Sequence, residues 1–387
     1  MRGLHADAQG DGIADGRGRR TLGADHQLWR DHQLRSGSAG TGDRPLRSDP
    51  GGPVSLSRAE IIEILTDHAA GPALRERADG LRRQLHGDAV HFRAILEFSN
   101  HCRASCLYCG INCRTAGVER YRMERADILA ATERIVDAGF NTVILQSGED
   151  RAVKPEWLAG IIGDIKQSHD VAVSLSVGEW PRAVYELWRG AGAERYLLKL
   201  ETADGELYER LHPGMSHRNR RRCLGDLFEL GYQVGSGNIV GLPGQGPAEL
   251  AADILDFQAN PYDMIAVGPL IPAAGTPYAD LPRPSEDSVL RTIALARIAA
   301  PKAHLPSPTA LCALEPDARR RALEWGANVL MIGFTPPEVA RKYRIYQRAE
   351  CGSTQSCLDC LRGVVTDLGR SVGRGKGHGF RSSDTPE

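Results

Sequence analysis

Long apolar runs are missing from this chain of 387 residues. No segment approaches the roughly 18 apolar residues that cross a bilayer, and the N-terminus lacks the apolar core of a signal peptide. An excess of charge of one sign is also missing, because Lys+Arg total 48 and Asp+Glu total 49, which leaves a net charge of −1. Such a balance offers no general basic surface to nucleic acid. We therefore expect a soluble, cytoplasmic protein that acts on neither a membrane nor a nucleic acid.

Residues 1–53 differ from the rest of the chain because they contain no Val, Phe, Tyr, Glu or Lys. They are filled with Gly, Arg, Asp, Ser and His and show no apolar periodicity of a helix or a strand. A segment with so little to bury is expected to be a disordered, low-complexity extension. The whole chain is nevertheless 41% hydrophobic and 25% charged, a composition that allows a sizeable core beyond this extension.

Segments typical of strands and of helices alternate along most of the remaining chain. The candidate strands are residues 92–98, 142–145, 171–176, 195–200, 233–240, 264–267, 303–305 and 328–332. The candidate helices between them are residues 125–138, 155–168, 181–190, 220–230, 247–259, 284–299 and 316–325. Strands joined by helical crossovers imply a parallel sheet, which closes most simply into an α/β fold of the (βα)8 TIM-barrel type. An open doubly wound sheet is the alternative.

Four regions follow from this reading. After the extension at 1–53, residues 54–90 form a helical preface, in which the apolar spacing predicts two helices separated near Gly71-Pro72. Residues 91–335 form the barrel. Residues 336–387 form a C-terminal extension that carries a second group of cysteines and a Gly/Arg-rich tail. In such a barrel the chemistry is expected in the loops that follow the strands.

Three cysteines directly after the first candidate strand have the spacing Cys-x3-Cys-x2-Cys: Cys102, Cys106 and Cys109. Three thiolates this close together can hold three corners of a [4Fe-4S] cluster and leave one iron without a protein ligand. A fourth cysteine, Cys113, could complete the set and make the cluster inert. Structural zinc is the other alternative. Disulfides are disfavoured, because disulfide scaffolds are short and loop-rich and this chain is long and α/β-like.

This cysteine motif, with Tyr108 before its last cysteine, resembles the radical S-adenosylmethionine (SAM) superfamily. Across roughly residues 54–370 the chain is more narrowly similar to the HydE family of [FeFe]-hydrogenase maturases. The segments that carry this similarity are Ile95–Asn100, Leu145–Asp150, Leu175–Pro181, Arg195–Thr202 and Val240–Gln245. Biotin synthase and methylornithine synthase are relatives that share the barrel and the cluster loop.

The resemblance implies a radical enzyme. Its cluster would bind SAM at the open iron and cleave it reductively to methionine and a 5′-deoxyadenosyl radical. The implied substrate is a cysteine-bound iron carbonyl–cyanide precursor of the hydrogenase di-iron subcluster. The implied partners are other hydrogenase maturases and an electron donor such as ferredoxin or flavodoxin. The alternatives are a methylornithine-synthase-like or biotin-synthase-like radical enzyme, and a non-catalytic zinc-binding scaffold.

The resemblance also implies which residues bind the cofactor: Tyr108, Gln146, Gly148, Glu149, Ser174, Glu201, Arg220 and Ile239. Glu201 is expected at the ribose hydroxyls, Arg220 at the cofactor carboxylate and Ile239 against the adenine. The alternative interpretation of residues 146–150 is a polar turn. The arginines at 218–222 are also typical of a solvated helix face, and Ile239 of a core position.

On the substrate side, the resemblance implies that Ser147, Lys199 and Met331 are the catalytic candidates. Ser174 and Thr309 align with positions that line the same cavity. Lys199 stands where the family is expected to have Arg, which keeps the positive charge but loses the bidentate fork. Pro308 likewise replaces an expected Thr. Finally, Cys351, Cys357 and Cys360 form a group that implies an auxiliary iron–sulfur cluster, with zinc or no metal as alternatives.

Overall fold

The computed structural model describes residues 55–346 and 354–380, and the predicted extension at 1–53 lies outside these residues. Eight parallel strands form one sheet in the order β6-β5-β4-β3-β2-β1-β8-β7. They are β1 (Ala89–Ser99), β2 (Thr142–Ser147), β3 (Ala172–Ser176), β4 (Ala193–Leu197), β5 (Gln233–Val240), β6 (Met264–Pro269), β7 (Pro306–Ser307) and β8 (Val329–Gly333). The ends of the sheet meet where His304 pairs with Met264, so the barrel is nearly closed. The predicted TIM-type fold is confirmed.

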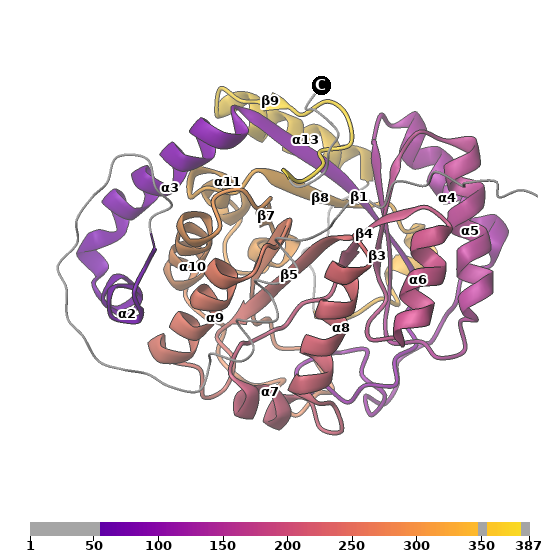
Figure 1. Ribbon diagram of the computed structural model, residues 1–387, viewed down its shortest axis with the longest axis horizontal. Helices are drawn as coiled ribbons and strands as arrows, with labels where there is room; N and C mark the ends of the chain where they lie inside the picture. Colours follow the sequence, from indigo (N-terminus) through magenta and orange to yellow (C-terminus); the bar gives the residue numbers. More distant parts are fainter. Residues whose placement is uncertain (1–54, 347–353, 381–387) are drawn as a thin grey trace, which may run out of the picture. The chain divides into compact units, whose positions relative to one another are not determined.

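Helices surround the strands (Figure 1). Two of them, α2 (Arg58–Thr66) and α3 (Gly71–His86), precede β1, as the apolar spacing predicted. The others within the barrel are α4 (Arg125–Asp137), α5 (Pro155–Ser168), α6 (Arg182–Gly190), α7 (Gly205–Leu211), α8 (His217–Glu229), α9 (Pro247–Ala259), α10 (Glu286–Ala299) and α11 (Ala318–Glu324). After β8 come α12 (Pro337–Ala340), α13 (Thr354–Asp367) and β9 (Ser371–Val372). No described helix is long and apolar enough to span a membrane.

Local sequence explains where several helices begin. Proline occupies the first turn of α5 and of α9, where its fixed φ suits a helix and its missing N–H costs nothing. Ser57, Ser216 and Ser285 accept a hydrogen bond from a backbone amide in the first turn of α2, α8 and α10. Each cap satisfies a donor that the helix itself cannot.

Two strand predictions were wrong in detail. The predicted strand at 303–305 is displaced, because the ladder to β8 begins at Pro306 while His304 instead bridges to β6. The predicted strand at 195–200 ends early, at Leu197. Beyond it the backbone continues beside β5, but Glu201 adopts a φ of 68° that breaks the pleat. Both differences arise from the neighbouring strands, which the local sequence does not reveal.

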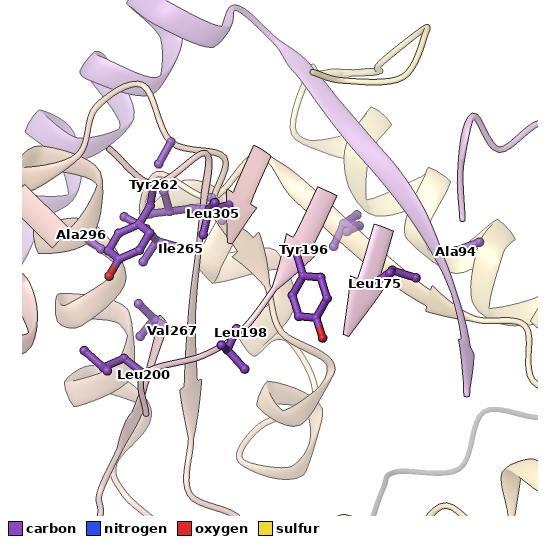
Figure 2. Close-up of a cluster of buried hydrophobic side chains, with 14 of the residues drawn as sticks. Ala94, Leu175, Tyr196, Leu198, Leu200, Tyr262, Ile265, Val267, Ala296 and Leu305 are labelled. Atoms are coloured by element: carbon purple, nitrogen blue, oxygen red, sulfur yellow. The ribbon is translucent and has the colours of Figure 1, made fainter. Parts of the chain in front are cut away.

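Aromatic residues packed between α6 and the sheet fix the loop that follows β3. The barrel strands contribute buried apolar side chains, among them Leu175, Tyr196 and Val267 (Figure 2). The Tyr196 hydroxyl donates to the carbonyl oxygen of Gly178 at 2.7 Å, and the Trp180 amide donates to the Tyr185 hydroxyl at 2.8 Å. The loop at 178–181 is therefore held at the rim by buried side chains.

The amino-terminal end of the barrel is covered by residues 371–380, which we call the C-terminal strap. Its first residues pair with the start of β1 (Figure 1). The buried guanidinium of Arg195 donates to the carbonyl oxygen of Lys376 at 2.6 Å, and that of Arg93 donates to the carbonyl oxygen of Gly377 at 3.2 Å. Glycine is needed at position 377, where φ is +57° and a Cβ would lie 2.7 Å from the His91 ring. Main-chain carbonyls thus complement two buried cations.

Candidate functional site

The loop after β1 brings the thiols of Cys102, Cys106 and Cys109 within electrostatic range of one another. The Glu149 amide donates to Cys102 Sγ at 3.4 Å, and the amide of Ile111 is directed at Cys109. Amide donors of this kind favour the thiolates that hold an iron–sulfur cluster, so the donor set fits one. Burial raises the pKa of Cys106, and that of Cys109 to about 12. Metal binding would therefore displace thiol protons.

A network of side chains orders the rest of this loop. Arg120 donates to the carbonyl oxygens of Asn100, Ile111 and Asn112 at 2.6–2.7 Å. The Asn112 side chain donates to the carbonyl oxygen of Cys109 at 2.8 Å. The loop thereby turns back, and Cys113 lies exposed near Cys102. Among residues 55–346 and 354–380, no three His, Cys, Asp or Glu side chains converge as ligands of a single metal ion.

The residues after β2 pack directly on the cysteine loop. A Cβ on Gly148 would lie 2.4 Å from the carbonyl oxygen of His101 and 2.7 Å from Cys102 Cβ, so only glycine fits there. Asp150 accepts hydrogen bonds from Ser99 at 2.6 Å and from Arg122 at 2.7 Å, and these partners lower its pKa against the effect of burial. The predicted polar turn is a packed contact between β1 and β2.

Glu149, Glu179 and Arg220 form a buried charged group beside this contact. Arg220 Nε lies 2.8 Å from Glu179 Oε1, and Arg220 Nη2 lies 3.9 Å from Glu149 Oε1. The Glu179 amide also donates to Glu149 Oε1 at 3.1 Å. Arg220 is only 8% exposed, so it does not belong to a solvated helix face. Two carboxylates and one guanidinium can bind the ammonium and carboxylate of an amino acid.

Glu201 and Lys199 lie at the carboxyl end of β4, and their side chains are paired at 2.9 Å between Lys199 Nζ and Glu201 Oε2. Among the described residues, Glu201 is the only non-glycine residue with positive φ. Two backbone hydrogen bonds to β5 hold this conformation: the Glu201 amide donates to Gly237, and the Ile239 amide donates to Glu201. A strained backbone held in this way often marks a functional position.

Tyr108 and Ile239 meet in a small apolar cluster that is separate from the main core. Its other members come from the loops around β5, β6 and α7: Leu207, Leu211, Leu242, Leu270, Tyr278 and Leu281. The Tyr108 hydroxyl lies 2.7 Å from His212 Nε2, while His212 Nδ1 lies 2.6 Å from the carbonyl oxygen of Tyr208. Burial lowers the pKa of His212 to about 4, so the ring is neutral, Nδ1 donates and Nε2 accepts. The apolar cluster suits contact with a planar ring.

The remaining candidates lie at two depths in the barrel. Gln146 and Thr309 face tyrosines of the segment after α12: Gln146 Nε2 donates to the Tyr343 hydroxyl at 3.2 Å, and Thr309 Oγ1 lies 3.0 Å from the Tyr346 hydroxyl. Ser147, at the end of β2, donates to the carbonyl oxygen of Gly148 at 2.7 Å. Ser174 on β3 and Met331 on β8 lie deeper, because they pair with Ile144 on β2 and with Arg93 on β1. These candidates therefore lie at different distances from the carboxyl ends of their strands.

Cys357 lies half-buried and Cys360 lies exposed on α13, one helical turn apart. Cys351 falls outside the described residues. The helix places the two described thiols near the same face, which is compatible with joint metal ligation. The auxiliary cluster thus stays a prediction.

Sequence reasoning missed several residues that complete the site. Glu179 lies inside a segment used for the family resemblance, but it received no role. Asp253 on α9 accepts hydrogen bonds from the Ala203 amide at 2.6 Å and from Asn238 Nδ2 at 2.9 Å. Burial raises the pKa of this carboxyl to about 7. The Asp253 side chain links the ends of β4 and β5. Its place in the helical pattern of the sequence does not indicate this role.

The fold and the cysteine loop together define the class. Residues 96–257 match the family model described as the radical SAM superfamily. In solved structures, the chain resembles methylornithine synthase (PylB) with a TM-score of 0.74 at 24% identity, over 83% of this chain and 95% of that chain. It also resembles HydG, a maturase of the [FeFe]-hydrogenase, with a TM-score of 0.69 at 19% identity, over 81% of this chain and 72% of that chain. This is a radical SAM enzyme with a TIM-type barrel.

Sequence similarity identifies the family within that class. The [FeFe] hydrogenase maturase subunit HydE of Thermotoga maritima is 41% identical over 334 residues, which are 85% of this chain and 96% of that protein. A 3-methylornithine synthase of Methanosarcina acetivorans is 28% identical over 252 residues, 65% of this chain and 71% of that protein. The chain belongs to the HydE family of [FeFe]-hydrogenase maturases.

Proposed function

We propose that this HydE-family protein uses a SAM-bound [4Fe-4S] cluster to act on a cysteine-bound iron carbonyl–cyanide precursor of the hydrogenase di-iron subcluster. The observation that carries the proposal is the contact between the cysteine loop and the end of β2, where the Glu149 amide meets Cys102 Sγ at 3.4 Å. One short segment thus supports a cluster ligand and also presents the buried carboxylate of Glu149. A cluster held by Cys102, Cys106 and Cys109 would supply the electron for reductive cleavage of SAM.

The chain's own residues have distinct roles in this proposal. Cys102, Cys106 and Cys109 would hold the cluster, and the open corner would take the amino acid end of SAM. Glu149 and Glu179 carry negative charge suited to the SAM ammonium, while Arg220 pairs with both of these buried carboxylates. Glu201 would accept from the ribose hydroxyls. Tyr108 and Ile239 would pack on the adenine, because they share one apolar cluster.

On the substrate side, Lys199 supplies a positive charge at the end of β4, where an anionic cyanide- or carboxylate-bearing ligand would approach. Its charge is offset by Glu201 at 2.9 Å, so binding of an anion would compete with an existing ion pair. Ser147 offers a hydroxyl at the same level, and Met331 an adaptable thioether deeper in the barrel. Cys357 and Cys360, with Cys351, would hold an auxiliary cluster.

Anaerobic reconstitution with iron and sulfide, followed by dithionite and SAM, tests the proposal. The loaded protein should form 5′-deoxyadenosine, and electron paramagnetic resonance of the reduced cluster should change when SAM is added. A fully loaded cluster that gives neither result would refute the enzyme assignment. Zinc without labile sulfide would instead favour a metal-binding scaffold.

The identity of the substrate is tested by comparing the turnover of compounds from three reaction classes. Turnover of the iron carbonyl–cyanide–cysteine compound is expected to exceed turnover of lysine, which tests methylornithine formation, and of dethiobiotin, which tests sulfur insertion. Product transfer to another hydrogenase maturase should follow only with the iron compound. A preference for lysine or dethiobiotin would contradict the proposed substrate while leaving the radical chemistry intact.

A further inference from the structure

Four arginines surround the outer side of the charged group formed by Glu149, Glu179 and Arg220. They are Arg103, Arg151, Arg182 and Arg222, and we call them the arginine surface. Three of them line one surface depression of about 320 Å³, together with Glu179, Trp180, Pro181 and Asn219. The guanidinium of Arg151 lies 4.4 Å from the centroid of the Trp180 ring. The fourth, Arg103, directly follows Cys102 in the sequence.

The charges at this surface are arranged with the cations outward. Arg103 is 46% exposed and its partner Glu149 only 7%. Arg222 is likewise 46% exposed, whereas its partner Asp226 is 15% exposed. Arg182 is 44% exposed and pairs with Asp226 and with Glu229, which is 26% exposed. Each of these three guanidinium groups is therefore more exposed than the carboxylates with which it pairs, so cations form the outer layer of this surface.

We propose that the arginine surface docks an acidic, low-potential electron-carrier protein that reduces the cluster. The inference rests on the proposed function, because reductive cleavage of SAM consumes one electron in each turnover. Arg103 connects the surface to Cys102, and Arg151 follows Glu149, whose amide meets Cys102 Sγ. A partner seated on these arginines would thus lie beside the segments that hold the cluster ligand.

The chemistry of the surface fits a transient protein partner. Arginine side chains are enriched at protein interfaces and are among those that supply most of the binding energy. Opposite charges on the two proteins mainly accelerate association, and they do so less at high salt. Such fast and weak docking suits an electron donor, because the donor must bind, transfer one electron and then dissociate.

The test compares reduction by a protein with reduction by a small molecule. Stopped-flow bleaching of the reconstituted cluster, without SAM, is followed with reduced flavodoxin and in parallel with dithionite. The double variant Arg151→Gln/Arg182→Gln should lower the second-order rate constant for flavodoxin by about tenfold at low salt. Its rate with dithionite should match that of the parent. As salt is added, the rate constant for reduction by flavodoxin should also fall more for the parent protein than for the variant.

A matched control removes two other exposed arginines, Arg83 and Arg362, which are 60% and 50% exposed. The double variant Arg83→Gln/Arg362→Gln should keep the parent rate with flavodoxin. Equal rates for the parent and the Arg151/Arg182 variant would overturn the proposal, as would an equal loss with both reductants. A variant that slows product transfer to another protein, but not reduction, would overturn it in favour of a different partner. Failure of the proposed function would appear separately, as a reduced cluster that forms no 5′-deoxyadenosine.

Discussion

Gly148 and Cys102 lie so close together that a single added carbon on the glycine would be 2.7 Å from the cysteine Cβ. This contact joins the end of β2 to the first cysteine of the cluster loop. It also sets the position of Glu149, whose amide and side chain both serve the candidate site.

Gly148→Ala should therefore damage the cluster loop more than the fold. The new methyl group would also meet the carbonyl oxygen of His101 at 2.4 Å, and backbone cannot yield as a flexible side chain does. We expect the affinity for cluster iron to fall by about 10–100-fold, the range for residues that support metal ligands. Iron and sulfide are measured per chain after reconstitution. Gly163→Ala in α5 is the control, because nothing lies within 4 Å of its added Cβ. Full iron loading of the Gly148 variant would contradict the geometry.

Single Cys→Ser variants should distinguish the three proposed cluster ligands from the neighbouring Cys113. Cys102→Ser, Cys106→Ser and Cys109→Ser are expected to abolish the [4Fe-4S] signal. Cys113→Ser should retain it, because Cys113 is exposed and is not needed to leave one iron open. The measurement is the electron paramagnetic resonance spectrum of each reduced protein with and without SAM. Loss of the cluster in the Cys113 variant would identify a fourth ligand and refute an open iron.

Glu179→Gln should weaken the fold as well as cofactor binding. The carboxylate is 4% exposed and lies 2.8 Å from Arg220 Nε, so its neutralisation leaves a buried cation with only the more distant Glu149. Breaking a buried ion pair in this way costs about 3–5 kcal/mol. Denaturant unfolding measures the loss, and calorimetry on the cluster-loaded protein measures SAM affinity.

Glu229→Gln is the matched control for that variant. Glu229 is 26% exposed and lies 2.6 Å from Arg182, so this partly exposed pair should contribute less than about 1 kcal/mol. If both variants lose the same stability, the buried group has no special energetic role.

The amino-terminal end of the barrel should make the protein sensitive to acid. Burial lowers the pKa of His91 to about 4 and that of His86 to about 3, well below the ordinary value of 6.5, and Arg93 and Arg195 face His91. Between pH 6.5 and 4 the unfolded chain therefore binds protons that the folded chain does not. Stability should fall as the pH is lowered through this window, by about 1.4 kcal/mol per pH unit for each histidine.

Urea unfolding at pH 7, 6 and 5 checks this expectation with His91→Gln, which removes one of the titrating groups. The variant should show a shallower loss of stability than the parent as the pH falls. An identical slope in the two proteins would show that His91 is not buried as a neutral ring.

Much of the fold could be predicted from local sequence, because strand and helix periodicity depends on residues close together in the chain. Helices α5 (Pro155–Ser168) and α9 (Pro247–Ala259) each begin at a proline, and both have the bounds that the pattern predicted. The strand near residue 303 was misplaced, because its ladder depends on which partner strand lies beside it. Periodicity carries no information about that partner.

The site could be predicted where its residues cluster in the sequence. It could not be predicted where the fold brings distant residues together. Cys102, Cys106 and Cys109 stand together and were found directly. Glu179 and Asp253 acquire their roles only from side chains that fold back on them from distant helices and strands, such as Arg220 and Asn238. No spacing rule connects such partners.

The C-terminal strap has a consequence for how the protein is made. Ala89 pairs with Ser371, and Arg93 and Arg195 find their carbonyl partners only at Gly377 and Lys376. A ribosome delivers β1 before the strap, so the strands between them emerge while both guanidinium groups still lack these carbonyl partners. Closure of that end must therefore wait until the strap itself has been synthesised.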